Sequence, residues 1–514
     1  MRQGQASVTL CLPLPPRLRR QCCCLSCALL AALWTALPAK ATAGPAALLD
    51  ASEVGIRDDL AWLADRGLIS LGLSTWPMPV SLVTSAIGAR SSGDWSEADL
   101  DALARIRDSL ARLDATAVVS WRINSARHPV SDAGLAVRAR NEVSAQLQAG
   151  TDTASLRLRL GVQQQSLASP PSQATLDGSY AALRLPGAMV TLGAVDRWWG
   201  PARAASPILG NAAPAIPTLT LRRSDESAPE TPGLAWIGPW SYEVSIGRPR
   251  HYEPSGAATI GIRLTARPLP GLELGIGRFI YWGGEGQPHS LDSLLDALLG
   301  RSNIDDPSIP DPSNEIAGVD VRWALPTATA TWIGYAHLAG EDEANATPSK
   351  WIATVGLQLK HATARHRIEW TAEGGDTRLG NLFGLHPEKL QAAYQHSTYV
   401  KGHYHQGLPI GAFIGGGGLL ASIGVAVIPI DSPSALRYAA SLWTANVSQH
   451  GSEPINAAYG LPGRVNGLSL QSSGMTNSLR WRVGLALQHR PDGAETSRST
   501  VGIIGGIELP LREP

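Results

Sequence analysis

Three histidines near residue 400 are the side chains best able to do chemistry: His396, His403 and His405. The last two are spaced i and i+2, which would place them on one face of a strand, and a zinc ion can use such a pair. No partner carboxylate stands near them in the sequence. We therefore favour ordinary histidines of a loop or a barrel lumen, and we predict no metal and no cofactor.

Catalytic motifs give no support for an enzyme. The sequence contains no G-x-S-x-G nucleophile elbow and no H-E-x-x-H helix. Two acidic segments, residues 305–315 and 340–344, lack the ligand spacing of a known calcium loop, and solvated connections are the favoured interpretation. We therefore predict that the protein is not an enzyme.

One aromatic segment is unusual, reading DRWWGPARAASPILGNAAPAIP at residues 196–217. The chain has 16 Trp and only 3 Phe, whereas a soluble core normally mixes its aromatic residues. The adjacent Asp196 and Arg197 are predicted to hold local architecture, and the following Gly-Pro pair fixes the backbone beside the two rings. What the rings do depends on the fold that carries them.

The N-terminus has the pattern of a signal peptide over residues 1–43. Arg17, Arg19 and Arg20 precede an apolar run at residues 25–37 that is too short to span a bilayer. Ala39-Lys40-Ala41 and Ala41-Thr42-Ala43 are candidate cleavage sites, and we predict cleavage near Ala43. All five cysteines lie in this segment: Cys11, Cys22, Cys23, Cys24 and Cys27. The mature chain is thus predicted to lack disulfides and thiolate chemistry.

Charge excludes one class of partner. The first 43 residues hold five basic residues and no acidic ones, so the mature chain has 38 basic and 43 acidic residues, a net charge of −5. A nucleic-acid-binding protein would need a basic face, which this balance does not suggest.

Residues 44–115 are predicted to form a small helical region. Its clearest helix begins after Ser96, which can cap it, and carries acidic residues in its first turn. Apolar residues then recur at spacings of three and four, at Leu100, Leu103, Ile106, Leu110 and Leu113.

From about residue 116 the hydrophobic period changes to two, and residues 116–514 are predicted to be β-structure. Leucine alternates with arginine at residues 156–160, and similar alternation recurs at 260–267, 319–323 and 479–488. Each strand therefore has one apolar face and one face with Arg, Asp, Gln or Gly. A soluble sandwich or solenoid would turn the apolar face inward, whereas a transmembrane barrel would turn it toward lipid.

Three observations favour the barrel. The signal peptide indicates export, and no mature stretch has the 18 or so apolar residues of a helical span. Aromatic residues near strand ends fit interfacial belts, as at Trp282, Trp332, Trp351 and Trp370. We predict an all-β antiparallel transmembrane barrel of roughly 16–20 strands, with 18 as the best estimate, and with the helical region at its periplasmic end.

A family resemblance becomes specific across residues 57 to about 415. The order RDDLAWLADRGLISLGLSTWPMP, VDRWWGP, SPILGNAAPAIPTLTLRR, APETPGLAWIGPWSYEVSIG, RPLPGLELGIGRFIYWGGEGQP, NEIAGVDVRW, YAHLAGEDEA and YQHSTYVKGHYHQGLPIGAFIG resembles the Wzi family of capsule-assembly outer-membrane proteins. The resemblance implies a lectin-like barrel that binds exported capsular polysaccharide and helps to keep it on the cell surface.

This implied function gives the tryptophans a chemical role. A sugar ring has an apolar C–H face that can lie on Trp, and a polar rim that Arg and Asn can hydrogen-bond, with charge-assisted bonds to acidic sugars. The candidate polysaccharide contacts are Arg197, Trp198, Trp199, Asn211, Trp236 and Trp240. The alternative interpretation is that these tryptophans form a membrane girdle or pack a loop folded into the lumen, and for the Trp198–Trp199 pair we favour packing.

The prediction is therefore a bacterial outer-membrane protein that binds capsular or other surface polysaccharide, contacts outer-membrane lipid and acts as a monomer. One alternative is a porin whose lumen arginines pass sugars or other small solutes, and a less favoured one is an outer-membrane hydrolase. A packed lumen would exclude conduction, whereas an open one would permit it.

Overall fold

The computed structural model describes residues 44, 46–113, 117–125, 138–166, 173–300, 313–344, 347–379, 391–432, 434–447, 463–476, 478–491 and 498–511. The predicted signal peptide, residues 1–43, lies outside the described residues. The helices are α2 (Val54–Asp65), α3 (Val80–Gly88), α4 (Glu97–Arg112), α5 (Leu291–Leu299) and the 3₁₀ turn η1 (Ala235–Ile237).

The long strands form one antiparallel sheet. In chain order they are β4 (Ala117–Asn124), β5 (Ala139–Gly150), β6 (Ala154–Ser166), β7 (Gln173–Thr175), β8 (Tyr180–Leu185), β9 (Ala188–Gly193), β11 (Thr218–Arg223), β12 (Trp240–Gly247), β13 (Ala258–Leu269), β14 (Leu272–Trp282), β15 (Ser313–Pro326), β16 (Ala330–Ala344), β17 (Thr347–Ala362), β18 (His366–Asp376), β23 (Leu419–Pro429), β24 (Arg437–Val447), β25 (Gly463–Thr476), β26 (Leu479–Arg490) and β27 (Arg498–Pro510).

This sheet closes on itself because β27 pairs with β4. β7 and β8 both pair with β6, along different stretches of it, so together they occupy one position in the wall. The described strands thus fill 18 positions, which confirms the predicted antiparallel barrel and its best estimate of strand number. None of the described helices combines the length and apolarity needed to cross a membrane.

The two faces of the strands alternate as predicted. In β6, Leu156 and Leu158 are exposed on the outer surface, whereas Arg157 is buried and pairs with Asp50. The other arginines predicted to point inward also meet groups inside the barrel: Arg159 meets Glu142, Arg263 meets Asp320, Arg322 meets Asp65, Arg480 meets Glu53, and Arg482 lines a lumen cavity. Lipid favours this arrangement, because an arginine facing it at mid-membrane costs about 2–4 kcal/mol.

Aromatic residues mark one edge of the apolar outer surface. Trp332 and Trp370 stand near strand ends and are each paired with Leu359 of the strand between them, so they share one row across β16, β17 and β18. Both rings are exposed. This row is typical of the aromatic belt at a membrane interface.

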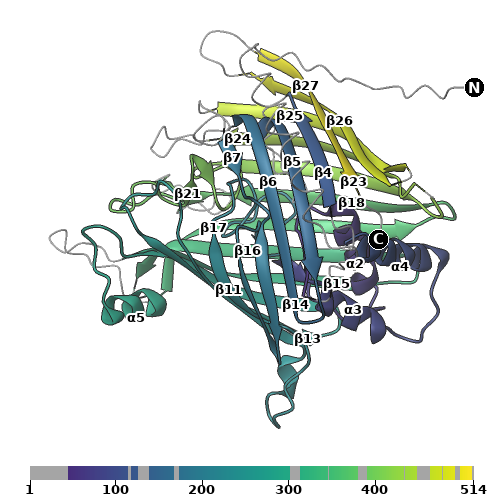
Figure 1. The fold of residues 1–514 in the computed structure, drawn as a ribbon, viewed down its shortest axis with the longest axis horizontal. Helices are drawn as coiled ribbons and strands as arrows, with labels where there is room; N and C mark the ends of the chain where they lie inside the picture. The colour runs from purple at the N-terminus through teal and green to yellow at the C-terminus, as the bar shows by residue number, and fades with distance from the viewer. Residues whose placement is uncertain are drawn as a thin grey trace, which may run out of the picture. The chain divides into compact units, whose positions relative to one another are not determined.

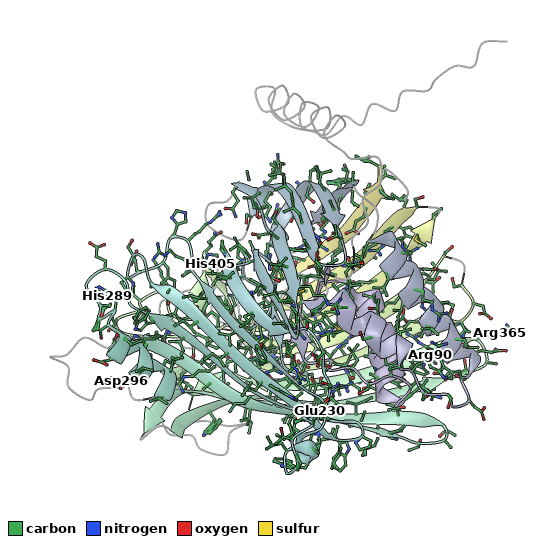
Figure 2. All side chains as sticks on the ribbon, turned by 60° about the horizontal axis from the view of Figure 1, so that its bottom comes forward. Arg90, Glu230, His289, Asp296, Arg365 and His405 are labelled. Atoms are coloured by element: carbon green, nitrogen blue, oxygen red, sulfur yellow. The ribbon has the colours of Figure 1, made fainter. Side chains whose placement is uncertain are left out.

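The two ends of the barrel differ in their connections. One end, the short-turn end, has tight turns such as Leu269–Leu272 and Ala362–His366, and it carries α2, α3 and α4 (Figure 1). The other, the long-loop end, carries α5 and most of the long connections. Figure 2 shows the labelled Arg90 and Arg365 on the side of the helices, and His289 and Asp296 on the opposite side.

The helical region has local causes in the sequence. Ser96 caps α4 and forms a capping box with Asp99, as predicted from its place before the apolar repeat. Asp99 also accepts a hydrogen bond from Trp62 Nε1 at 2.7 Å, which ties α4 to α2. The helices bury one apolar cluster that includes Leu60, Leu63, Val83, Ala102 and Ile106.

Two segments between barrel strands fold into the lumen. We call residues 194–217, between β9 and β11, the first insert, and residues 391–418, between β18 and β23, the second insert. Four pairs of two-residue strands lie among the described residues outside the barrel sheet: β1 (Leu48–Leu49) with β3 (Met78–Pro79), β2 (Thr75–Trp76) with β10 (Trp198–Trp199), β19 (Arg378–Leu379) with β20 (Gln391–Ala392), and β21 (Tyr404–His405) with β22 (Leu408–Pro409).

Candidate functional site

The tryptophan pair lies in the first insert as the short strand β10. It pairs with β2 of the helical region, so that Trp198 faces Trp76 and Trp199 faces Thr75 in register. The Trp198 ring is 1% exposed and belongs to the apolar cluster of the helices, while its Nε1 donates to the carbonyl of Ala202 at 3.0 Å. The guanidinium of Arg57 lies 5.5 Å from the centre of that ring.

Trp199 faces the barrel wall and is 0% exposed. Its Nε1 donates to Glu243 Oε1 at 3.2 Å, and Arg263 lies over its ring at 5.9 Å. Arg197 reaches the same carboxylate at 3.4 Å and also bonds Thr220. The pair therefore bridges the helical region and the barrel wall, and its contacts support the packing interpretation that the sequence favoured.

Asn211 is also buried, at 1% exposure, and its backbone oxygen accepts a hydrogen bond from Arg138 at 2.8 Å. Arg138 precedes β5 and pairs with Asp196 at 2.6 Å and with Asp177 at 3.4 Å. Burial raises the pKa of Asp196, although the charge of Arg138 opposes that shift. These contacts place Asp196 among groups that hold local architecture, as the buried contacts of Arg197 with Glu243 and Thr220 do for that residue.

Trp236 and Trp240 lie apart from the other four candidates. Trp236 is in η1, in the connection from β11 to β12 at the short-turn end, and its side chain is 71% exposed. Trp240 begins β12, and the guanidinium of Arg223 covers its ring at 4.2 Å. The structure therefore does not assemble the six predicted residues into one exposed site.

The two inserts hold each other through backbone and aromatic contacts. Tyr394 of the second insert donates from its hydroxyl to the carbonyl of Pro207 at 2.6 Å, and the amide of Gly210 donates to Ile410 at 2.7 Å. One buried cluster joins both inserts to the barrel wall, including Ile208, Phe279, Tyr281, Tyr394, Tyr404 and Ile414. Side chains therefore fill this part of the lumen.

The predicted histidine cluster belongs to this packing. His403 Nε2 donates to the carbonyl of Ile208 at 2.6 Å, and His405 Nδ1 donates to that of Pro214 at 2.9 Å. His405 Nε2 accepts from the amide of Arg250 at 3.2 Å, so both of its ring nitrogens are used. Burial lowers the pKa of each histidine to about 4, so both are neutral at pH 7. Within the described ranges, no three His, Cys, Asp or Glu side chains are grouped to hold a metal ion.

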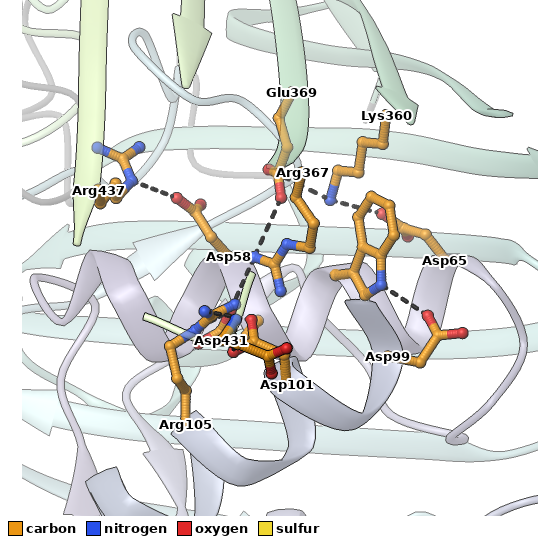
Figure 3. A network of polar contacts seen from close by, with 12 residues as sticks. Asp58, Asp65, Asp99, Asp101, Arg105, Lys360, Arg367, Glu369, Asp431 and Arg437 are labelled. Carbon is orange, nitrogen blue, oxygen red and sulfur yellow. Dashed lines mark hydrogen bonds and ion pairs between the residues drawn. The ribbon is translucent and has the colours of Figure 1, made fainter. Parts of the chain in front are cut away.

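Carboxylates of α2 anchor the helical region to the barrel wall (Figure 3). Asp58 pairs with Arg437 at 2.9 Å and with Arg203 of the first insert at 2.7 Å. At the end of the same helix, Asp65 pairs with Arg322 at 2.5 Å and with Lys360 at 2.9 Å.

The charges around these carboxylates keep them ionised. Burial alone would raise the pKa of Asp58, but Arg437 and Arg203 outweigh it and hold that pKa well below its ordinary value. Arg322 and Lys360 likewise lower the pKa of Asp65 against the opposing effect of burial.

Two inward-facing glutamates anchor backbone segments inside the barrel, and the sequence did not predict them. Glu373 of β18 accepts three backbone N–H bonds from Arg203, Ala204 and Ala205 at 2.6–3.0 Å. Glu273 of β14 accepts from the amides of Leu73 and Ser74 at 2.9 and 3.1 Å. In the sequence, each glutamate is visible only as a lone carboxylate on the polar face of a strand. The sequence does not show which backbone amides that carboxylate would bind.

Another part of the lumen is not filled. Two adjoining cavities of about 260 and 350 Å³ lie along the wall formed by β4, β5, β6, β26 and β27. Arg122, Arg159, Arg480 and Glu508 line both. The smaller cavity reaches Asn124 and Arg138 near the long-loop end, and the larger reaches Leu113, Ser478 and Pro510 at the short-turn end. We call the joined space the lumen groove.

Comparison with known proteins gives three concordant matches. The family model described as capsule assembly protein Wzi matches residues 126–425. A Klebsiella pneumoniae protein described as an uncharacterized 55.8 kDa protein in the cps region is 30% identical over 470 residues, covering 91% of this chain and 90% of that protein. The solved Wzi of Escherichia coli, described as an outer-membrane protein involved in group 1 capsule assembly and a carbohydrate-binding β-barrel, is 29% identical with a TM-score of 0.77, covering 90% of this chain and 99% of that chain.

Proposed function

Because the chain belongs to the Wzi capsule assembly family, we propose that it binds exported capsular or related polysaccharide and helps to retain and assemble it on the cell surface. The observation that carries the proposal is the match in sequence and fold, over nine tenths of the chain, to a carbohydrate-binding barrel of the outer membrane. It is a binding protein of the bacterial outer membrane rather than an enzyme.

The filled part of the lumen supports retention over conduction. The first and second inserts pack against each other and against the wall between β12 and β18, with Trp199, Tyr281 and Tyr394 buried among them. A porin needs a continuous aqueous path of useful width. Dense packing across this part of the lumen confines solutes to the lumen groove on the opposite side, and this narrowing favours holding a polymer over passing free solutes.

The short-turn end faces the periplasm in this proposal, because outer-membrane barrels have short periplasmic turns and longer extracellular loops. The apolar outer surface contacts outer-membrane lipid, and the protein acts as a monomer. Polysaccharide attachment rests on many weak contacts, since one stacking or hydrogen-bonding contact contributes only about 1 kcal/mol in water. A long polymer offers repeated units, so avidity supplies what a single contact lacks.

Among the six candidates, Trp236 and Trp240 are the proposed direct sugar contacts, and because they lie at the short-turn end, they would meet the polymer on the periplasmic side of the barrel during its assembly. Trp236 has an exposed ring, and Trp240 is partly accessible beside Arg223. Arg197, Trp198, Trp199 and Asn211 are proposed to support the site through the fold, because their contacts lie inside the barrel.

The test is a deletion strain complemented with the wild type, Trp236→Ala or Trp240→Ala, with cell-bound and released polysaccharide measured separately. We expect the deletion to release polymer and each variant to weaken attachment while the barrel still inserts. Trp332→Ala, in the aromatic belt, is the matched control and should retain polymer.

Two outcomes would contradict the proposal in different ways. If the deletion leaves attachment unchanged and the purified protein conducts small sugars or ions across a planar bilayer, the porin alternative is correct. If the deletion releases polymer but neither tryptophan variant does, the function holds and the assignment of these two residues is wrong.

A further inference from the structure

The lumen groove has a row of charged side chains set by strand register. Three adjacent strands align in register here: Arg482 of β26 lies opposite Gly506 of β27, and Gly506 lies opposite Arg122 of β4. Arg122 in turn lies opposite Glu142 of β5 in the strand register. Because the middle strand offers a glycine, the floor between the two arginines carries no side chain.

Charged groups in this groove remain accessible although they lie inside the barrel. The side chains of Arg122 and Glu508 are 43% and 29% exposed, with a separation of 3.3 Å. Arg480 and Glu53 are 30% and 34% exposed. An incoming anion would therefore meet arginines whose ion pairs are accessible to water, at 3.3 Å for Arg122 with Glu508 and at 2.9 Å for Arg480 with Glu53, so binding would not require breaking a dry ion pair.

Positive charge exceeds negative charge in the larger cavity, whereas the lining of the smaller cavity holds eight arginines and eight carboxylates. The charged lining of the larger cavity consists of five arginines and three carboxylates: Arg112, Arg122, Arg157, Arg159, Arg480, Asp50, Glu53 and Glu508. Hydroxyl and amide groups also line it, including Ser120, Ser144, Gln146 and Gln148, beside apolar residues such as Val118 and Met475. Guanidinium groups suit carboxylates, and hydroxyls and amides suit the hydroxyl groups of a sugar ring.

The dimensions fit a short run of sugar units. Cavities of about 260 and 350 Å³ adjoin, and together they are comparable to small-ligand sites of roughly 300–1,000 Å³. Their lining runs from Pro510 at the short-turn end to Arg138 near the long-loop end. An elongated groove suits part of a linear polymer better than a compact solute.

We propose that the lumen groove is a binding site for carboxylated saccharide units, with Arg122 and Arg480 as the principal anion contacts. This inference rests on the proposed function, and it gives that function a substrate class and a place in the barrel distinct from the tryptophans.

The first experiment measures binding to the full-length barrel in detergent by calorimetry, with digalacturonate as the acidic probe and maltose as its neutral counterpart. We expect digalacturonate to bind, with affinity falling as salt is raised, and maltose to bind at least tenfold more weakly. Arg122→Gln and Arg480→Gln should each weaken digalacturonate binding about tenfold or more, since each removes a charge-assisted bond. Arg365 is exposed at the short-turn end, outside the groove, and Arg365→Gln should leave the affinity for digalacturonate unchanged.

Glu508→Gln gives a test that misfolding cannot imitate. Glu508 lies 3.3 Å from Arg122 and 3.7 Å from Arg480, so it competes with an incoming carboxylate for both arginines. Removing its charge should tighten digalacturonate binding severalfold. Unchanged affinity in all three groove variants would overturn the proposal, as would maltose binding equal to that of digalacturonate. Binding of inorganic sulfate as tight as that of digalacturonate would also overturn it, by showing an anion site without sugar recognition.

A second experiment separates this inference from the proposed function. The deletion strain is complemented with Arg122→Gln/Arg480→Gln, and cell-bound polysaccharide is measured. If both the deletion and the double variant release polymer, the result supports the proposed function and the groove as the binding site. Release by the deletion alone leaves the function intact and overturns the groove as the retention site. Retention in the deletion strain contradicts the proposed function, whatever the purified protein binds.

Discussion

The two sides of the lumen use the same residue types in opposite ways. On the side of β12 to β18, charged groups are dry: Arg263 and Asp320 are each 1% exposed and lie 2.8 Å apart. On the side of β26, β27 and β4 to β6, Arg122 and Glu508 pair more loosely at 3.3 Å and remain accessible. The helical region and the first insert fill the first side, whereas the second keeps the lumen groove.

This difference teaches what the inward charges are for. On the packed side they fix segments of the chain: Arg263 also donates to Thr75 and Ser74 of the helical region, each at 2.8 Å. On the open side, Arg122 pairs with Glu508 and stays 43% exposed, while Arg480 contacts Glu508 at 3.7 Å and also bonds Glu53, at the start of α2, at 2.9 Å. The same alternation of leucine and arginine thus gives dry ion pairs in one place and accessible ones in another.

The largest expected difference between the two sides is in the free energy of unfolding lost when one arginine on each side is replaced by alanine. Arg263→Ala should destabilise the barrel by about 3–5 kcal/mol, because it leaves the buried carboxylate of Asp320 without its partner. Arg122→Ala should cost less than about 1 kcal/mol, because its pair is accessible to water. Urea unfolding of the barrel in lipid vesicles measures both, and equal losses would show that the two sides do not differ in this way.

Replacing one glycine on each side by alanine should give a smaller difference in the free energy of unfolding. In Gly200→Ala the added Cβ would lie 2.3 Å from His337 Nδ1, at a backbone φ of +95°, so we expect a loss of at least about 1–3 kcal/mol. In Gly506→Ala the nearest atoms are 3.8 Å away, and the change should stay within about 0.5 kcal/mol. The same unfolding assay applies, and a large loss for Gly506→Ala would mean that the groove is more tightly packed than its geometry shows.

Acid should loosen the packed side gradually. His403 and His405 have pKa values lowered from 6.5 to about 4 by burial, so the unfolded chain binds more protons than the folded chain between those values. Their contribution to stability is complete above about pH 6.5 and is lost as the pH falls toward 4, and the loss at pH 5.5 is about 1.4 kcal/mol for each histidine.

Stability measured from pH 7.5 to 4.5 should therefore decline, and the decline should be reduced in His403→Gln. His289→Gln, near α5 and exposed, is the control and should follow the wild type. A wild-type curve that stays flat between pH 6.5 and 5 would contradict the neutral, buried state of these histidines.

Local patterns in the sequence were sufficient for much of the architecture. The period-2 alternation at residues 156–160 predicted both the barrel wall and the inward direction of Arg157 and Arg159, because successive side chains on a strand must point to opposite faces. Ser96 marked the start of α4 for an equally local reason. Helix α5 was missing from the prediction, although Ser290 and Gly300 stand where a helix begins and ends.

By itself, the sequence determined the barrel, the helices before it and the family, and it predicts an export signal. Only the tertiary structure decided which charges meet, as when Asp65 pairs with Arg322 or Glu373 holds the amides of residues 203–205. It also decided that Trp198 and Trp199 are buried and that the lumen groove stays open. The reason is that a side chain's direction follows from its own strand, whereas its partner depends on where distant segments enter the closed barrel.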